Sequence, residues 1–229
     1  MCKLYVSYIP KVQGETPDFK IIKTLKKCMA YYSGCNNIIS SPGYLSNKTH
    51  VKDFVKEFKK VIPAKNKVYI GYFKGMNKLT ALLGVDLIDK HYKELVRTGK
   101  FIKLKMNIAN KADHRKMMFI YGINENPTFD FEKEVLNKST KDKFLRSITV
   151  NAILIGSSNQ SYSTYFGGAK KRADKGEADI LLFVPTDTTD IKNKMYVEGT
   201  VVFEEVIGAN DPHDYLKDIL KEFLSRTLV

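Results

Sequence analysis

The spacing of hydrophobic residues along the chain switches between a helical period and a strand period. Apolar residues recur every three or four positions in four segments, which predicts helices at residues 18–32, 50–62, about 79–96 and 214–228. Alternating or short continuous apolar runs predict strands at residues 37–41, 67–73, 101–106, 114–121, 149–155, 179–184 and 196–206. The segment 124–146 is polar and charged, and one or two short helices are expected there.

Strands that alternate with helices predict an α/β fold with a mixed β-sheet flanked by helices. The chain has no long linker rich in Pro, Gly or Ser, no low-complexity tract and no internal repeat. We therefore expect a single domain over residues 1–229, a length that allows a sizeable hydrophobic core.

The chain is strongly basic, with 38 Lys and Arg residues against 25 Asp and Glu residues and a net charge of +13. Such an excess favours polyanionic partners, nucleic acid first and an anionic membrane surface second. Lysine-rich surfaces also occur in proteins that bind no polyanion, and that alternative stays open.

Several site classes and locations are disfavoured by the sequence. No apolar run approaches the roughly 20 residues that span a bilayer, and the N-terminus lacks the apolar stretch of a secretory signal. The three cysteines, Cys2, Cys28 and Cys35, lack metal-ligand spacing, which predicts free thiols in a reducing compartment. Phosphate-binding Gly-rich loops, G-x-S-x-G elbows and H-E-x-x-H motifs are missing too. We expect a cytoplasmic protein with no membrane association, no metal and no cofactor.

Two short motifs at strand positions carry the candidate chemistry. His114, Arg115 and Lys116 precede an apolar run, and a Gly-Ser-Ser-Asn sequence at residues 156–159 ends a second apolar run. A histidine and a lysine two positions apart point to the same side of a strand, so both groups face one ligand. Serine and asparagine add neutral donors, which suit a phosphodiester that gains negative charge. The two motifs together indicate phosphodiester chemistry without a metal.

The H-x-K motif followed by G-S-x-N resembles the signature of the phospholipase D superfamily. Residues 38–46 and 67–73 look like the first two strands of these domains, and residues 176–182 resemble a glutamate before the last core strand of the nuclease branch. The pattern is most similar to the restriction-endonuclease-like branch. The resemblance implies a phospholipase D-like core at about residues 37–184, with a helical extension at 1–36 and an added strand and helix at 185–229.

The resemblance implies a role for five residues. His114 would be the nucleophile, which attacks phosphorus and forms a phosphohistidine that water then hydrolyses. Lys116 would hold a non-bridging phosphate oxygen, Asn159 would donate to the same phosphate, and Ser157 would bond the phosphate or a neighbouring histidine. Glu177 would accept a hydrogen bond from His114 and fix its tautomer. The plainer alternatives are a surface or core histidine, a solvated lysine, an ordinary turn and a solvated glutamate.

The reaction also needs an acid to protonate the leaving alkoxide, and the family uses a second histidine for that step. The other histidines of this chain, His50, His91 and His213, lie in no second H-x-K motif. The resemblance therefore implies a homodimer, in which two copies of His114 face each other across a two-fold axis.

The chain departs from the family pattern at two places. The family has an aspartate seven positions after the histidine, where this chain has Tyr121. The interval between Lys116 and Gly156 is also longer than usual, so the insertion at 124–146 must loop out without separating the two strands. This insertion could shape substrate access or the dimer. Both departures bear on catalytic competence more than on the fold.

A basic and aromatic stretch lies between Asn159 and Glu177. It contains Lys170, Lys171 and Arg172, with Tyr165 a few positions before them. Basic side chains neutralise phosphates and aromatic rings stack on bases, so this stretch suits a nucleic-acid strand. A solvated loop with aromatic anchors is the equally simple alternative.

Three hypotheses follow. The first is a homodimeric, metal-independent nuclease of the phospholipase D superfamily that cleaves nucleic acid, with DNA favoured over RNA. The second is a catalytically degenerate member that only binds nucleic acid or a protein partner, as an accessory or inhibitory factor. The third is a lipid phosphodiesterase, which is disfavoured because the chain lacks an apolar interfacial helix and a second motif copy.

Overall fold

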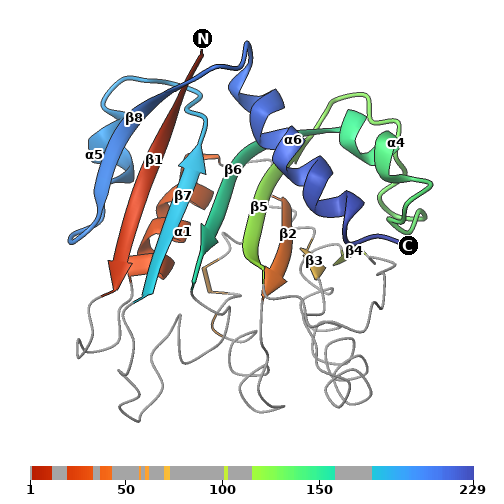
Figure 1. The fold of residues 1–229 in the computed structure, drawn as a ribbon, viewed down its shortest axis with the longest axis horizontal. Coiled ribbons are helices and arrows are strands. Elements are labelled where there is room, and N and C mark those ends of the chain that lie inside the picture. Colours follow the sequence, from red (N-terminus) through yellow and green to blue (C-terminus); the bar gives the residue numbers. More distant parts are fainter. Residues whose placement is uncertain are drawn as a thin grey trace.

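The strands of the protein form one mixed sheet in the order β4-β3-β2-β5-β6-β7-β1-β8 (Figure 1). The computed structural model describes residues 2–11, 20–32, 37–42, 57, 60–61, 70–72, 101–102, 115–157 and 177–229. Its strands are β1 Cys2–Lys11, β2 Asn37–Pro42, β3 Ile70–Tyr72, β4 Phe101–Ile102, β5 Lys116–Ile123, β6 Ile148–Gly156, β7 Glu177–Phe183 and β8 Val201–Ile207. Its helices are α1 Lys20–Tyr31, α4 Lys141–Arg146, α5 Ile191–Met195 and α6 Pro212–Ser225.

The sheet combines antiparallel and parallel pairing. The six strands from β2 through β5, β6, β7 and β1 to β8 are antiparallel to their neighbours. Strands β3 and β4 continue the sheet beyond β2 in parallel. The predicted α/β class with a mixed sheet is therefore confirmed.

Most predicted elements are present where the structure describes the chain. Strands β2, β5, β6, β7 and β8 and helices α1 and α6 match the predicted segments within a few residues, and the short β3 and β4 lie inside theirs. The predicted helix at 79–96 lies outside the described residues, and of the one at 50–62 only Glu57, Lys60 and Val61 are described.

Strand β1 and helix α5 were not predicted. Residues 1–36 were expected to be a helical extension, but β1 is a strand inside the sheet, between β7 and β8. Leu4, Tyr5 and Val6 are consecutive and all buried, because this part of the strand is covered on both faces. A strand covered on both faces loses the alternation that marks a half-buried strand in the sequence. α5 has only five residues, too few to show a helical period.

Each face of the sheet is covered by one long amphipathic helix, α1 behind and α6 in front in Figure 1. Helix α1 buries Ile21, Ile22, Leu25, Cys28 and Met29 against one face. Helix α6 buries Leu216, Leu220, Phe223 and Leu224 against the other. Full burial of one such side chain stabilises the fold by about 1.5–3 kcal/mol. We call the two sides the α1 face and the α6 face.

The start of α6 is encoded locally. The Asp211 carboxylate accepts hydrogen bonds from the backbone N–H groups of His213, at 2.7 Å, and of Asp214, at 3.3 Å. Pro212 occupies the first turn, where its missing N–H has no intrahelical partner to lose. This cap sets where the helix begins and therefore which of its residues meet the sheet.

The insertion at 124–146 leaves β5 and β6 paired from Met117↔Ile155 to Ile123↔Ile148, with one irregularity after Ile120. The expectation that it loops out without separating the strands is confirmed. Its phenylalanines are core residues on the α6 face, and the rings of Phe129 and Phe144 pack edge to face at 5.5 Å. The insertion joins the ends of the two strands opposite to Lys116 and Gly156. That it shapes substrate access or the dimer stays a prediction.

Candidate functional site

Strand pairing brings the described residues of the two motifs together. Strand β5 begins at Lys116 and strand β6 ends at Gly156, and the two strands are antiparallel with Met117 opposite Ile155. One further step of this register places Lys116 beside Gly156. Figure 1 shows the arrowheads of β2 and β6 at the end of the sheet where β5 begins. We call this the Lys116 end.

Lys116 lies on the α1 face. It alternates along β5 with Met118 and Ile120, which belong to the core under α1, and its side chain is half-buried. Gly156 follows Leu154 by two positions and shares the same face. The side chain of Lys116 and any group that lies against Gly156 from the α1 side are therefore on the same face of the sheet.

Arg115 faces the opposite side, as the strand alternation predicts. Its guanidinium donates to the backbone carbonyl of Phe223, at 3.3 Å, and to the Thr227 hydroxyl, at 2.8 Å. It also lies 4.4 Å from the centre of the Phe223 ring. Arg115 thus anchors the last turn of α6, and its role is structural.

Replacing Arg115 with alanine is expected to lower the free energy of unfolding by about 2 kcal/mol, because a cation–π contact and two half-buried hydrogen bonds are lost. Urea denaturation followed by circular dichroism measures the change. Lys141→Ala is the control, since Lys141 also bonds α6, at Ser225, but on the surface. It should lower the free energy by less than about 0.5 kcal/mol. Equal effects would contradict the anchoring role.

Ser157 ties the end of β6 to the start of β7. Its backbone N–H donates to the carbonyl of Ala178 at 3.0 Å, and its hydroxyl oxygen accepts from the N–H of Ala178 at 3.1 Å. The hydroxyl hydrogen has only a long contact, 3.4 Å, to the Ala178 carbonyl. Ser157 therefore has a structural role, and its O–H can still donate to a ligand.

Strand β7 brings acidic residues to the same end. It begins at Glu177, whose backbone pairs with Lys11 of β1, and Asp179 stands directly opposite Gly156. Asp179 is only 2% exposed, on the α1 face. Sequence reasoning chose Glu177 and missed Asp179. The available signal was a lone carboxylate at an inward position of an apolar strand, which is rare unless the group is paired.

Six of the predicted site residues lie outside the described residues. They are His114, Asn159, Tyr165, Lys170, Lys171 and Arg172. The structure thus brings Lys116, Ser157 and the start of β7 together, and it leaves the predicted nucleophile and the predicted basic stretch undescribed.

His213 is the one described histidine, and its place is far from the Lys116 end. Its Nδ1 lies 2.9 Å from the carbonyl oxygen of Val150, near the start of β6. Six residues of strand separate Val150 from Gly156, about 20 Å. His213 therefore cannot act as a second histidine beside Lys116 in the same subunit. His50 and His91 lie outside the described residues.

Tyr121 stands where the phospholipase D pattern has an aspartate, and it is a core residue on the α6 face. Its side chain is fully buried, and its ring packs edge to face on Phe144 at 5.5 Å. Five residues of strand place it about 16 Å from Lys116. Tyr121 therefore contributes to packing of the core and does not contact the residues at the Lys116 end.

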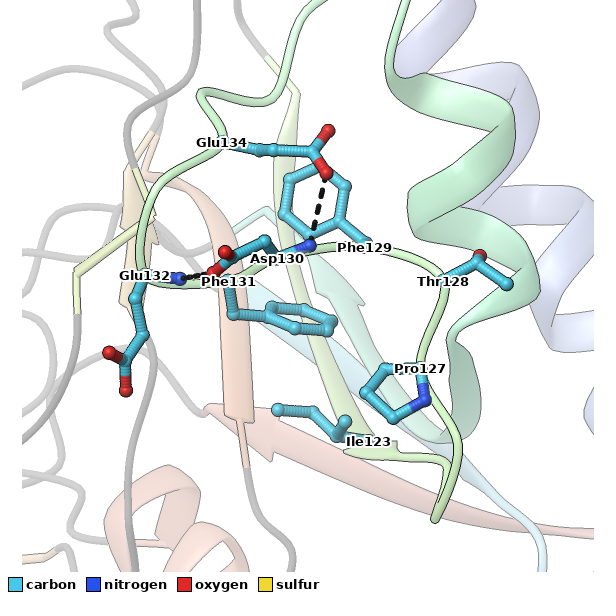
Figure 2. A pocket seen from close by; sticks show the side chains of 8 residues that line it. All are labelled: Ile123, Pro127, Thr128, Phe129, Asp130, Phe131, Glu132 and Glu134. Atoms are coloured by element: carbon cyan, nitrogen blue, oxygen red, sulfur yellow. Dashed lines mark hydrogen bonds between the residues drawn. The ribbon is translucent and has the colours of Figure 1, made fainter.

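A hollow of about 490 Å³ lies within the insertion, at the far end of β5 (Figure 2). Three of its lining residues are acidic: Asp130, Glu132 and Glu134. The backbone N–H of Glu132 donates to the Asp130 carboxylate at 3.0 Å and, together with the neighbouring Lys133, lowers the pKa of Asp130. Three acidic side chains around one hollow disfavour the binding of a phosphate there.

Two further findings concern the described residues alone. No group of three or more His, Cys, Asp and Glu side chains there is placed to hold a metal ion. No helix there is both long enough and apolar enough to cross a bilayer.

No protein-family model matches the chain, and no curated protein matches it. A function therefore has to come from the chemistry of the residues at the Lys116 end of the sheet.

Proposed function

We propose that this chain is a metal-independent phosphodiesterase with a phospholipase D-like fold, and that it is a nuclease that cleaves DNA at a homodimeric site. The observation that carries the proposal is the pairing of β5 with β6. It sets Lys116 beside Gly156 and Ser157 at one end of the sheet, with the start of β7 next to them. The described residues of two motifs, 40 positions apart in the sequence, thus lie at one end of the sheet, which supports the proposal.

In the proposed reaction the neutral imidazole of His114 attacks phosphorus. A P–N bond forms and the P–O bond to the leaving group breaks. The leaving alkoxide takes a proton from the imidazolium of His114 of the partner subunit. Water then attacks the phosphohistidine, gives its proton to that second imidazole and releases the phosphate monoester. Both histidines return to their starting states.

The developing negative charge on the phosphate needs fixed donors and a cation. Lys116 supplies a point charge from the α1 face, and Ser157 supplies the O–H that is only weakly engaged by Ala178. Asn159 supplies an amide N–H. Glu177 orients His114. These are the groups that charge stabilisation requires when the reaction uses no metal.

Nucleic acid is the proposed substrate because of charge. The net charge of +13 favours a polyanion. Lys170, Lys171 and Arg172 would contact the phosphates of a strand, and Tyr165 would stack on a base.

The test uses the purified chain with single- and double-stranded DNA and RNA in EDTA. We expect the wild type to cleave DNA and His114→Ala to be inactive. The two proteins are then unfolded, mixed and refolded so that subunits exchange. If each phosphate needs both histidines, an equal mixture retains about one quarter of the activity, because mixed dimers are inactive. Half of the activity would contradict the shared site, and no cleavage of any substrate by the wild type would contradict the function.

One observation favours the second candidate, a degenerate member that only binds nucleic acid or a protein partner. The hydroxyl oxygen of Ser157 already accepts a hydrogen bond from Ala178, so the turn also serves the fold. In that case DNA binding would persist without turnover and would be unaffected by His114→Ala. A filter-binding assay run beside the cleavage assay separates the two candidates, because only the second predicts DNA binding without cleavage by the wild type.

A further inference from the structure

A buried carboxylate lies at the Lys116 end and belongs to none of the sequence motifs. Asp179 is 2% exposed, whereas Ile180, the next residue of β7, is 39% exposed on the other face. Moving a carboxylate out of water costs several kcal/mol unless charges or hydrogen bonds stabilise it. The position of Asp179 two residues after Glu177, in a strand otherwise apolar up to Phe183, therefore calls for a reason in its surroundings.

Gly156 makes room for this carboxylate. A Cβ built on Gly156 would lie 1.8 Å from Oδ1 of Asp179 and 2.7 Å from the carbonyl oxygen of Ala178. Non-bonded atoms do not approach so closely, so any other residue at this position would displace the carboxylate. The Asp179 carboxylate therefore lies over β6, in the place where the side chain of residue 156 would be.

That place is next to Lys116. Residues directly opposite each other on neighbouring antiparallel strands have Cβ atoms about 5 Å apart. Because the carboxylate occupies the Cβ position of Gly156, it lies at about this distance from the Cβ of Lys116, on the same α1 face. The four-carbon stem of lysine can bring its ammonium group to the carboxylate from there.

We propose that Asp179 is a positioning residue of the site: its carboxylate, which extends over Gly156, orients the Lys116 ammonium group toward the bound phosphate. This role rests on the proposed function. The carboxylate does not touch the substrate, and it differs from the role of Glu177, which orients the histidine. Gly156 is part of the same arrangement. Only a residue without Cβ leaves room for the Asp179 side chain of β7 to extend over β6 toward Lys116 of β5.

The first test observes Lys116 directly and needs no activity. Lysines are labelled by reductive ¹³C-methylation, and the Lys116 signal is identified as the one that Lys116→Arg removes. We expect Asp179→Asn, which keeps the shape and removes the charge, to shift this signal. Asp218→Asn is the matched control, since Asp218 is exposed on α6, and it should leave the signal in place. An unchanged signal in folded Asp179→Asn overturns the proposal.

The second test is kinetic. With DNA as substrate, Asp179→Asn is expected to lower kcat by about 10- to 100-fold and to change KM by less than about threefold, because a misplaced ammonium group stabilises the transition state less. A kcat equal to that of Asp218→Asn would overturn the proposal. If the wild type cleaves nothing, the proposed function fails, and the Lys116 signal still decides whether the two groups interact.

If Asp179→Asn does not fold, the thermal stability of Lys116 variants provides the test. If the ammonium group stabilises the buried carboxylate, Lys116→Gln lowers the Tm. Lys116→Arg keeps the charge, so its Tm should lie closer to that of the wild type. Equal Tm values for the wild type and both variants overturn the proposal.

Discussion

Replacing Lys116 with alanine is expected to lower the rate of DNA cleavage by at least about 1,000-fold in EDTA. In the proposed metal-independent reaction, the cation at the Lys116 end carries most of the stabilisation of the charge that develops on the phosphate. Removing one preorganised donor of this kind typically costs a factor of about 100 to 1,000. Because Lys116 carries a full positive charge and is half-buried, its loss should lower the rate by the upper value or more. Single-turnover assays with labelled DNA measure the chemical step apart from product release.

Two variants separate this role from a general effect of charge. Lys221→Ala removes the same charge from an exposed position on α6. It should change the rate of cleavage by less than about threefold, since surface charges act mainly on the rate at which protein and DNA meet. Lys116→Arg keeps the charge but changes its shape, so an intermediate rate is expected. If Lys116→Ala cleaves DNA at the rate of Lys221→Ala, Lys116 has no part in the chemistry.

Placing an aspartate at position 121, where the phospholipase D pattern has one, is expected to destabilise this protein by about 5 kcal/mol or more. Tyr121 is fully buried and packs on Phe144 and the core of the α6 face. The change removes a large aromatic side chain from a close-packed core, which alone costs about 3–5 kcal/mol. It also places a carboxylate among apolar residues. Guanidinium denaturation at pH 7 measures the loss, and little folded protein is expected.

Tyr121→Phe is the matched control. It keeps the ring and its contact with Phe144 and removes only the hydroxyl, so the free energy of unfolding should stay within about 1 kcal/mol of the wild type. A folded Tyr121→Asp within about 1 kcal/mol of the wild type would show that the site of residue 121 is polar. The assignment of residue 121 to the core would then be wrong.

The burial of Tyr121 gives this departure from the phospholipase D pattern a physical reason. Residue 121 is about 16 Å along β5 from Lys116, on the other face of the sheet. An aromatic residue at this position suits the insertion, whose phenylalanines pack against it. Tyr121 and the phenylalanines of the insertion therefore belong to the same packing of the α6 face, away from the groups at the Lys116 end.

The periods of the hydrophobic pattern determined much of this protein without any coordinates. They predicted α1 and α6, whose apolar residues recur at helical spacing, and the strands of the mixed sheet on either side of the motifs. They also predicted that Lys116 and Arg115 point to opposite sides, because neighbouring residues of a strand always do. These features depend on local geometry, which is encoded within a few residues.

Only the tertiary structure decided the rest. Strand β1 was missed because burial on both faces removes the alternation of polar and apolar residues. That the insertion lies at the end of the sheet opposite to Lys116 follows from the pairing of β5 with β6. Asp179 has no motif, and its importance depends on Gly156, a neighbour 23 positions away in the sequence and directly opposite in the sheet. Contacts between strands depend on register, and register is set by packing of the whole sheet rather than by any one segment.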